Sequence, residues 1–357
     1  MPPLRMMALT ALLTAVLLIV ACDSPPRAVR PVIYANNDQA AVAMRTAPTI
    51  LLVRIGEVRM IGRERSVAKP PGVGGPNAPT IPLHLARIGA EVLLTVHGQV
   101  RPSVEFYSWV WDSGSHGGPR LFHPTPGGIR LIFLRDEGGY LHTVGDYPSY
   151  DLELRSSWLP ALLSSWKSEQ MSGADPLVRL IALRLRAELE GVTEQQLRED
   201  FGEEGPRVNH HWVTDLGDLV RVAGPFFVVN QLDQLCLDAR SPSARFAACW
   251  VTAGYFPGRC EAYQLARKAT ADGFREDFLA RMFTSCKAVE RYKVDDIRSG
   301  EAPRFGFYGA SMAPQHRRET LRVFASAMDH EIQRTACGVA AATWEVRDLP
   351  ECTRSLK

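Results

Sequence analysis

Two short stretches place reactive side chains at spacings that known enzymes use. Ser164 and Lys167 have the S-x-x-K spacing, in which a lysine one helical turn away activates a serine nucleophile. Residues 309–313 read GASMA, close to the G-x-S-x-G turn that presents a serine between a strand and a helix. Neither has the context that its chemistry needs, because no S-D-N or K-T-G motif follows Ser164 and GASMA lies between predicted helices. The sequence therefore predicts no catalytic residue.

The histidines that could bind a metal ion lack the further ligands that such a site requires. His210 and His211 are adjacent, and on a helix their side chains would point about 100° apart. His330 begins HEIQR, which lacks the second histidine of the H-E-x-x-H zinc motif. His116 and His123 have no carboxylate or thiolate at a recognised spacing. We therefore expect no metal site and no cofactor.

The chain has seven cysteines, and their positions separate them into two groups. Cys22 ends the N-terminal apolar run, and the other six follow residue 235. Those six are Cys236, Cys249, Cys260, Cys286, Cys337 and Cys352. They contain no C-x-x-C pair, which argues against a zinc site or a thioredoxin-like redox centre. In an oxidising compartment these six cysteines predict up to three disulfides, and the sequence does not determine which cysteines pair. Buried free thiols are the alternative.

An aromatic row is the strongest candidate for a binding surface. Tyr107, Trp109 and Trp111 share one face of a predicted strand, opposite the core face that runs from Val104 to Val110. Such a row could stack against a sugar or a partner's side chains. The alternative is that it packs under the helical part and joins the two halves of the chain.

Residues 1–21 have the layout of a secretory signal peptide. Arg5 supplies a positive charge, residues 6–20 form an apolar stretch, and the small residue Ala21 precedes Cys22. The apolar stretch is shorter than the roughly 20 residues that a membrane-spanning helix needs. The four residues IVAC that end at Cys22 resemble the lipobox of bacterial lipoproteins.

The lipobox resemblance implies that the Cys22 sulfur receives a diacylglycerol, that the chain is cut before it, and that a fatty acid such as palmitate acylates the new N-terminus. Several acyl chains hold a protein firmly in a membrane, whereas one binds only marginally. Residues 22–47, which include the proline-rich DSPPRAVRP, are then a lipidated tether. Asp23 resembles an inner-membrane retention signal of enterobacterial lipoproteins. That rule does not hold across bacteria, so the inner and the outer membrane are both possible locations. An ordinary signal peptide that ends near a cysteine is the alternative.

Residues 48–155 are rich in short strands with period-two apolar patterns, bounded by glycine and proline. The predicted strands span residues 49–60, 88–98, 103–111, 129–135 and 140–144. Gly56 and Glu57 interrupt the first strand as a β-bulge would, and residues 62–80 predict a loop. Five short strands with an early bulge favour a small β-barrel of the OB type.

The order of these segments resembles the netrin-like domain. A short possible helix, DQAAVAMRTA, precedes TILLVRIGEV, EVLLTVHG, VEFYSW and GGIRLIFLRDEGGYLHTVGD. The netrin-like domain is the OB barrel that tissue inhibitors of metalloproteinases share with complement C-terminal modules. Those barrels carry disulfides and the inhibitors act through an N-terminal cysteine, whereas residues 23–235 contain none, and Thr46 and Pro48 occupy the corresponding region. The resemblance therefore implies the fold and not the inhibition.

Residues 156–357 have helical periodicity. In DPLVRLIALRLRAELEG, Asp175 is a predicted N-cap, Pro176 the first helical residue and Gly191 the stop. Similar units follow with short connections, and SPSARFAACWVTAGYFPGRCEAYQLARKA resembles a HEAT-like helical pair. We expect an all-α region of paired helices, with a compact irregular bundle as the alternative.

Together these features predict an α+β multidomain protein, a small five-stranded OB-like barrel followed by an all-α domain. We expect a protein lipid-anchored on the periplasmic face of a bacterial cell membrane, acting as a non-catalytic module that binds a protein or glycan of the cell envelope. The net charge of +2 and the lack of a basic stripe argue against a nucleic-acid partner. An envelope-polymer hydrolase without an identified site, and a netrin-like protease inhibitor, are the alternative functions.

Overall fold

The computed structural model describes most of the chain after residue 41. The described residues are 42–67, 81–111, 124–144, 159–168, 175–200, 212–213, 216–256, 258–269, 276–299, 317–342 and 349–355. Cys22, the loop histidines His116 and His123, the pair His210-His211 and the GASMA stretch lie outside these residues.

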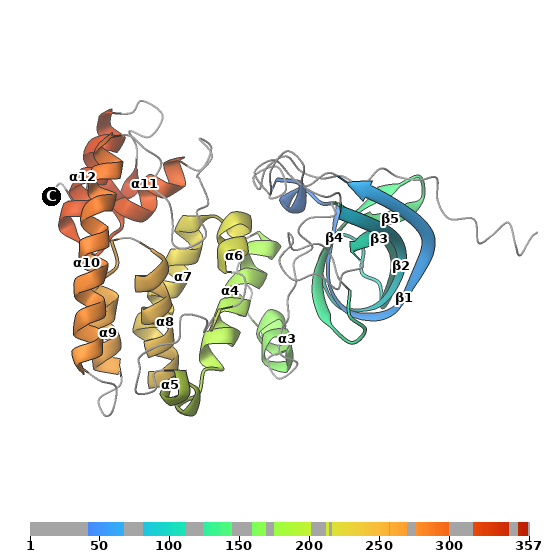
Figure 1. Ribbon diagram of the computed structural model, residues 1–357, viewed down its shortest axis with the longest axis horizontal. Helices are drawn as coiled ribbons and strands as arrows, with labels where there is room; N and C mark the ends of the chain where they lie inside the picture. Colours follow the sequence, from blue (N-terminus) through green and yellow to red (C-terminus); the bar gives the residue numbers. More distant parts are fainter. Residues whose placement is uncertain are drawn as a thin grey trace, which may run out of the picture.

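Five strands form a closed barrel in the order β1-β2-β3-β5-β4 (Figure 1). The strands are β1 (Thr49–Val67), β2 (Ile81–His97), β3 (Ser103–Trp111), β4 (Ile129–Glu137) and β5 (Tyr140–Thr143). All neighbouring strands pair antiparallel except β3 and β5, which are parallel. The predicted five-stranded OB-like barrel is confirmed.

The bulge in β1 is confirmed as well. Ile55 pairs with Ala90 and the next registered pair is Val58 with Ile88, so two residues of β1 lie opposite one residue of β2. A Cβ atom on Gly56 would lie 3.0 Å from a backbone oxygen of β2. Glycine therefore allows the two strands to approach at the bulge.

The first two strands are longer than their apolar pattern predicts. β1 continues to Val67 and β2 begins at Ile81, and these two residues pair with each other. The prediction of a loop from residue 62 was therefore wrong for residues 62–67. The end of β1 reads GRERSV, which has no alternating apolar residues, and backbone hydrogen bonds to β2 hold it in the sheet without that pattern.

The described part of the chain after the barrel is helical, as predicted. The helices are α3 (Leu159–Ser168), α4 (Pro176–Glu190), α5 (Glu194–Asp200), α6 (Leu216–Ala223), α7 (Pro225–Asp238), α8 (Pro242–Tyr255), α9 (Glu261–Ala269), α10 (Glu276–Ser299), α11 (Arg317–Ala325), α12 (His330–Ala342) and α13 (Pro350–Ser355). None of these described helices combines the length and apolar content needed to cross a membrane.

Local signals in the sequence set the ends of α4. The Asp175 side chain accepts a hydrogen bond of 2.7 Å from the Leu177 backbone N–H, and Pro176 occupies the first helical position. Gly191 ends the helix, and its backbone N–H donates to the Ala187 carbonyl. The predicted cap, first residue and stop are all confirmed.

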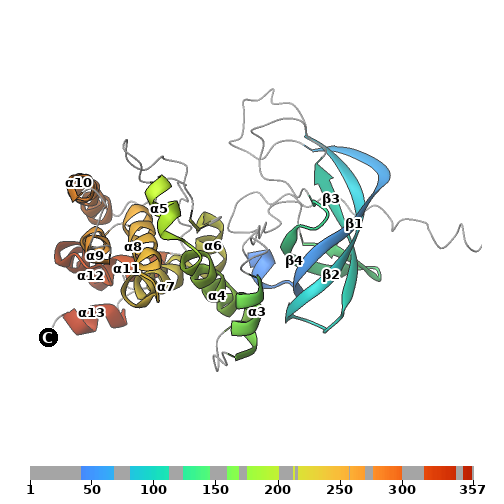
Figure 2. The same cartoon turned by 90° about the horizontal axis from the view of Figure 1, so that it is seen from below.

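Helices that follow each other in the chain pack together, and several distant ones also meet. α7 packs on α8 and α8 on α9, while α11 returns to α7 and α12 to α10 (Figures 1 and 2). Three disulfides join neighbouring segments: Cys236–Cys249, Cys260–Cys286 and Cys337–Cys352. All six cysteines that follow residue 235 are therefore paired, which confirms the predicted disulfides over the alternative of buried free thiols.

One apolar cluster joins the barrel to the helices. Leu52 and Phe133, on the outer face of the barrel, belong to the same cluster as Leu180 of α4. α4 packs against β2, and α3, α4 and α6 lie on the barrel side of the helices in both views (Figures 1 and 2). The cluster also contains Met44 and Ala47, so the last residues of the segment 22–47 are part of the folded structure.

The Asp175 cap gives a first prediction. Asp175→Ala should lower the free energy of unfolding by about 1 kcal/mol, because the first turn of α4 loses its acceptor. Asp238→Ala is the matched control, since Asp238 is exposed at the last residue of α7, and it should change stability by less than about 0.5 kcal/mol. Chemical denaturation measures both, and equal losses would contradict the capping role.

Candidate functional site

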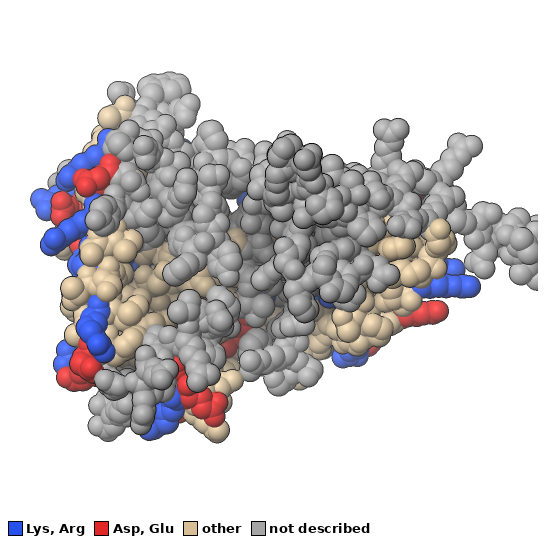
Figure 3. Space-filling view, viewed as in Figure 1, with Lys and Arg blue, Asp and Glu red and all other residues tan. Residues whose placement is uncertain are grey.

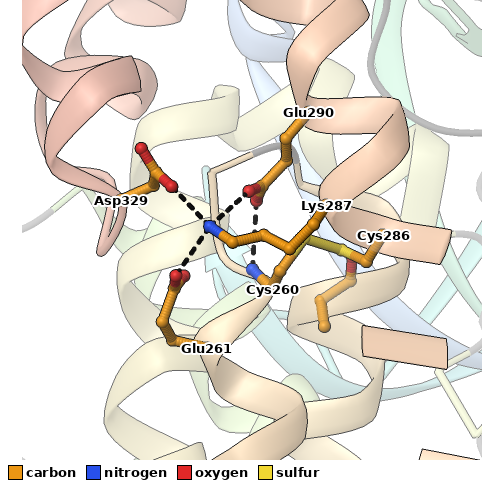
Figure 4. The surroundings of a disulfide bond; sticks show 7 residues. Cys260, Glu261, Cys286, Lys287, Glu290 and Asp329 are labelled. Atoms are coloured by element: carbon orange, nitrogen blue, oxygen red, sulfur yellow. Dashed lines mark hydrogen bonds and ion pairs between the residues drawn. A yellow bond between two sulfur atoms is a disulfide. The ribbon is translucent and has the colours of Figure 1, made fainter. Parts of the chain in front are cut away.

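A cluster of charged side chains in the described part of the chain surrounds Lys287 (Figure 4). The Lys287 ammonium of α10 donates to Glu261 Oε1 of α9 at 2.8 Å and to Glu290 Oε2 of α10 at 3.1 Å. It also donates to Asp329 Oδ2, immediately before α12. One ammonium therefore holds three carboxylates from three segments.

Asp329 has a second role as the N-cap of α12. Its Oδ1 accepts hydrogen bonds from the backbone N–H groups of Glu331 and Ile332, at 2.8 and 3.1 Å. Its other oxygen faces Lys287. These hydrogen bonds outweigh the effect of burial and hold the pKa of Asp329 below its usual value.

A turn with left-handed backbone sets the position of Asp329. Gly258 has φ +87°, and its carbonyl accepts hydrogen bonds from the backbone N–H groups of Met328 and Asp329, at 3.0 and 3.4 Å. A Cβ atom on Gly258 would lie 2.6 Å from the Ala327 Cβ atom. The site therefore requires glycine at this position, for backbone conformation and for space.

Glu290 connects the cluster to the Cys260–Cys286 disulfide. Its side chain is only 3% exposed, and its Oε1 accepts a hydrogen bond of 3.1 Å from the Cys260 backbone N–H. Burial raises the pKa of Glu290, and this effect is larger than the opposing effects of Lys287 and the Cys260 N–H.

Lys287 itself is charged at neutral pH. Partial burial disfavours its ammonium form, but the hydrogen bonds to Asp329, Glu261 and Glu290 outweigh burial and raise its pKa above the ordinary value. A lysine in this state is neither a nucleophile nor a general base, because both roles need the neutral amine. The arrangement thus acts as an electrostatic link between α9, α10 and α12.

A second polar cluster surrounds Arg259, which lies two residues before Glu261 in the sequence. The Arg259 side chain is fully buried, and its Nε donates to Asp233 Oδ2 of α7 at 3.1 Å. Its Nη1 donates to the Val323 carbonyl at 3.3 Å and its Nη2 to Ser326 Oγ at 2.8 Å. Burial raises the pKa of Asp233 and lowers that of Arg259, and their mutual attraction opposes both shifts.

The described residues contain one group of three potential metal ligands. The ligand atoms of Cys260, Cys286 and Glu290 all lie within 4.8 Å of one another. Metals bind cysteine as the thiolate, and in this structure the two sulfur atoms are bonded to each other. While the disulfide is intact, the group is therefore a structural link and offers no thiolate.

Two residues of the aromatic row, Tyr107 and Trp109, are buried. Tyr107 and Trp109 are 7% and 3% exposed, in a small apolar cluster with Leu83 and Leu85 of β2. Trp111 pairs with Leu83 through the backbone, and its side chain is outside the described part. In this structure Tyr107 and Trp109 therefore do not form an exposed stacking surface, and the ring of Tyr107 packs against Tyr140 and His142 of β5. Their cluster is also separate from the one that joins the barrel to the helices.

The remaining candidates from enzyme and metal motifs in the described part are Ser164, Lys167 and His330, and His330 directly follows Asp329. Ser164 and Lys167 are exposed on α3. His330 is exposed at the first residue of α12, where its ring nitrogen Nδ1 lies 3.4 Å from Gln333 Oε1. Neither position brings a nucleophile and a base together among the described side chains.

Sequence reasoning missed the Lys287 and Arg259 clusters. One local signal was present, since Glu290 follows Lys287 at the i, i+3 helical spacing. The Asp329 position before HEIQR is also a recognisable N-cap. The remaining partners come from other helices and have no sequence pattern that connects them.

No protein-family model matches this chain, and no curated protein sequence matches it.

Removing the central ammonium tests the electrostatic link. Lys287→Met keeps much of the side-chain stem, leaves three carboxylates without their shared cation, and should lower the free energy of unfolding by about 1–3 kcal/mol at pH 7. Lys268→Met is the matched control, because Lys268 is exposed near the end of α9, and it should change stability by less than about 0.5 kcal/mol.

The same variant should show a defined pH dependence. The pKa of Asp329 is lowered in the folded chain, so the stability it contributes is present above the unfolded carboxyl pKa and is lost as pH falls through the folded value. The difference in unfolding free energy between wild type and Lys287→Met should therefore narrow below about pH 4. Denaturation series at several pH values measure it, and a difference that stays constant into acid would count against the link.

Proposed function

We propose that this chain is a lipid-anchored protein of a bacterial cell envelope, and that its folded part is a non-catalytic binding or scaffolding module. One observation supports the proposal of a lipid anchor at Cys22. Of the seven cysteines, six pair with one another, and Cys22 is the seventh. It is the cysteine that ends the IVAC stretch after the apolar run, where lipoproteins carry their lipid.

The disulfides support an exported location. Disulfides persist in oxidising compartments such as the bacterial periplasm and are rare in the cytosol. A lipid on Cys22 would also remove the one thiol that could exchange with them. The membrane is thus the first proposed partner, with the folded part on its periplasmic face.

The barrel supports the netrin-like proposal at the level of strand order. Its closed arrangement β1-β2-β3-β5-β4 is OB-like, and netrin-like domains are OB barrels. Because residues 23–235 contain no cysteine, we do not extend the proposal to protease inhibition.

The charged clusters around Lys287 and Arg259 have a structural role. Lys287 and Arg259 donate to carboxylates and backbone groups of neighbouring helices, so these polar groups hold helices in place. On the face shown in Figure 3, positive and negative side chains are intermixed along the edge formed by α9, α10 and α12. Arg267 with Glu276 and Arg298 with Glu331 are examples of such surface pairs. A partner would be a protein or glycan of the envelope.

Cys22→Ala tests the anchor. The variant should accumulate as uncut precursor and lose labelling by a palmitate analogue, because the modified sulfur is absent. Gel mobility and label incorporation measure both effects in cells. Cys337→Ala is the control, since it removes a disulfide cysteine and should leave labelling unchanged. Full labelling of Cys22→Ala would refute the anchor.

Crosslinking tests the binding role. Purification of the chain from crosslinked envelopes should recover a specific protein or glycan, and the purified chain should release no product from cell-wall fragments. The control is a fusion of the same signal peptide and anchor to an unrelated folded domain, which should not recover the same partner. Absence of a partner combined with turnover of the fragments would favour the hydrolase.

A further inference from the structure

The three disulfides connect the cysteines in the order in which they occur after Cys22. Cys236 pairs with Cys249, Cys260 with Cys286 and Cys337 with Cys352, at sequence separations of 13, 26 and 15 residues. No disulfide loop encloses another or crosses it. Each bond joins neighbouring segments, namely α7 with α8, the residue before α9 with α10, and α12 with α13.

Loop length alone would not select these pairs. Cys249 and Cys260 are only 11 residues apart in the sequence. The probability of loop closure falls with about the 3/2 power of loop length, so this incorrect pair should form about 1.3-fold more readily than Cys236–Cys249 in an unstructured chain. It should form about 3.6-fold more readily than Cys260–Cys286.

Local helix signals can overcome this small preference. α8 begins with Pro242, and the Ser241 side chain accepts a hydrogen bond of 3.1 Å from the Ala244 backbone N–H. Residues 239–241 are a short connection, so formation of α7 and α8 as a hairpin brings Cys236 and Cys249 within 4.6 Å between their Cα atoms. That separation is within the normal range for a disulfide.

We propose that this chain acquires its disulfides directly from a thiol oxidase in chain order, with helix pairs selecting the partners, and that it needs no disulfide isomerase. A cysteine thiolate attacks the oxidase disulfide, forms a mixed disulfide and releases one oxidase thiolate. The second cysteine thiolate then attacks the mixed disulfide at the sulfur of the first cysteine. The chain gains its disulfide, the oxidase leaves as a dithiol with two electrons, and the two cysteine protons end on that dithiol.

The role of the thiol oxidase rests on the oxidising compartment proposed above. The choice of cysteine pairs by the helices does not depend on the lipid anchor and can be tested in vitro. The full chain with Cys22→Ser is reduced, unfolded and refolded with glutathione disulfide, with or without a disulfide isomerase. Peptide mapping without reductant should find mainly the three native pairs in both samples, and isomerase should change their yield by less than about twofold. A majority of Cys249–Cys260 bonds that isomerase converts to native pairs would overturn the proposal.

A variant makes the choice of partner explicit. Cys236→Ala frees Cys249 to attack Cys260, the partner that loop length favours. We expect Cys260–Cys286 and Cys337–Cys352 to form as in the parent, with Cys249 recovered as an alkylated free thiol. Cys337→Ala is the control for loss of one disulfide, because it leaves Cys352 without a near competitor. A Cys249–Cys260 bond in Cys236→Ala would overturn helix-directed pairing. If this variant does not fold, the refolding of the Cys22→Ser chain described above tests the proposal.

Discussion

A buried positive charge is the constraint on which the helical part depends. The Arg259 guanidinium is fully buried, and arginine side chains stay protonated in proteins. Its compensation comes from Asp233 of α7 and from Val323 and Ser326 at the end of α11. Because an uncompensated buried charge is strongly destabilising, α7, α11 and the start of α9 have to meet around this side chain.

The disulfides and the ionic clusters act over different distances along the chain. Each disulfide closes a loop of 13 to 26 residues and so restricts the unfolded chain locally. Lys287 reaches Asp329 across 42 residues, and Arg259 reaches Ser326 across 67. Covalent bonds therefore secure neighbouring helices, and charged hydrogen bonds decide how the secured groups pack on one another.

Apolar contacts join the barrel to the helices. Leu52 and Phe133 lie on the outside of the barrel, in the same cluster as Leu180 of α4. The barrel strands alternate, so Leu51 and Val53 fill the interior while Leu52 faces the helices. A protein tethered at one end would present the barrel and the helices together, since separating them would expose this apolar surface to water.

The sequence by itself determined the features whose causes are local. The bulge at Gly56, the Asp175 cap and the OB-like series of strands all follow from residues within a few positions or from one neighbouring strand. Tertiary structure decided the rest: which cysteines pair, that Tyr107 and Trp109 are buried, and which carboxylates surround Lys287. Those outcomes depend on how separate elements approach in space. A hydrogen bond or an apolar contact requires two groups to be close in space, and such groups can be any number of residues apart in the sequence.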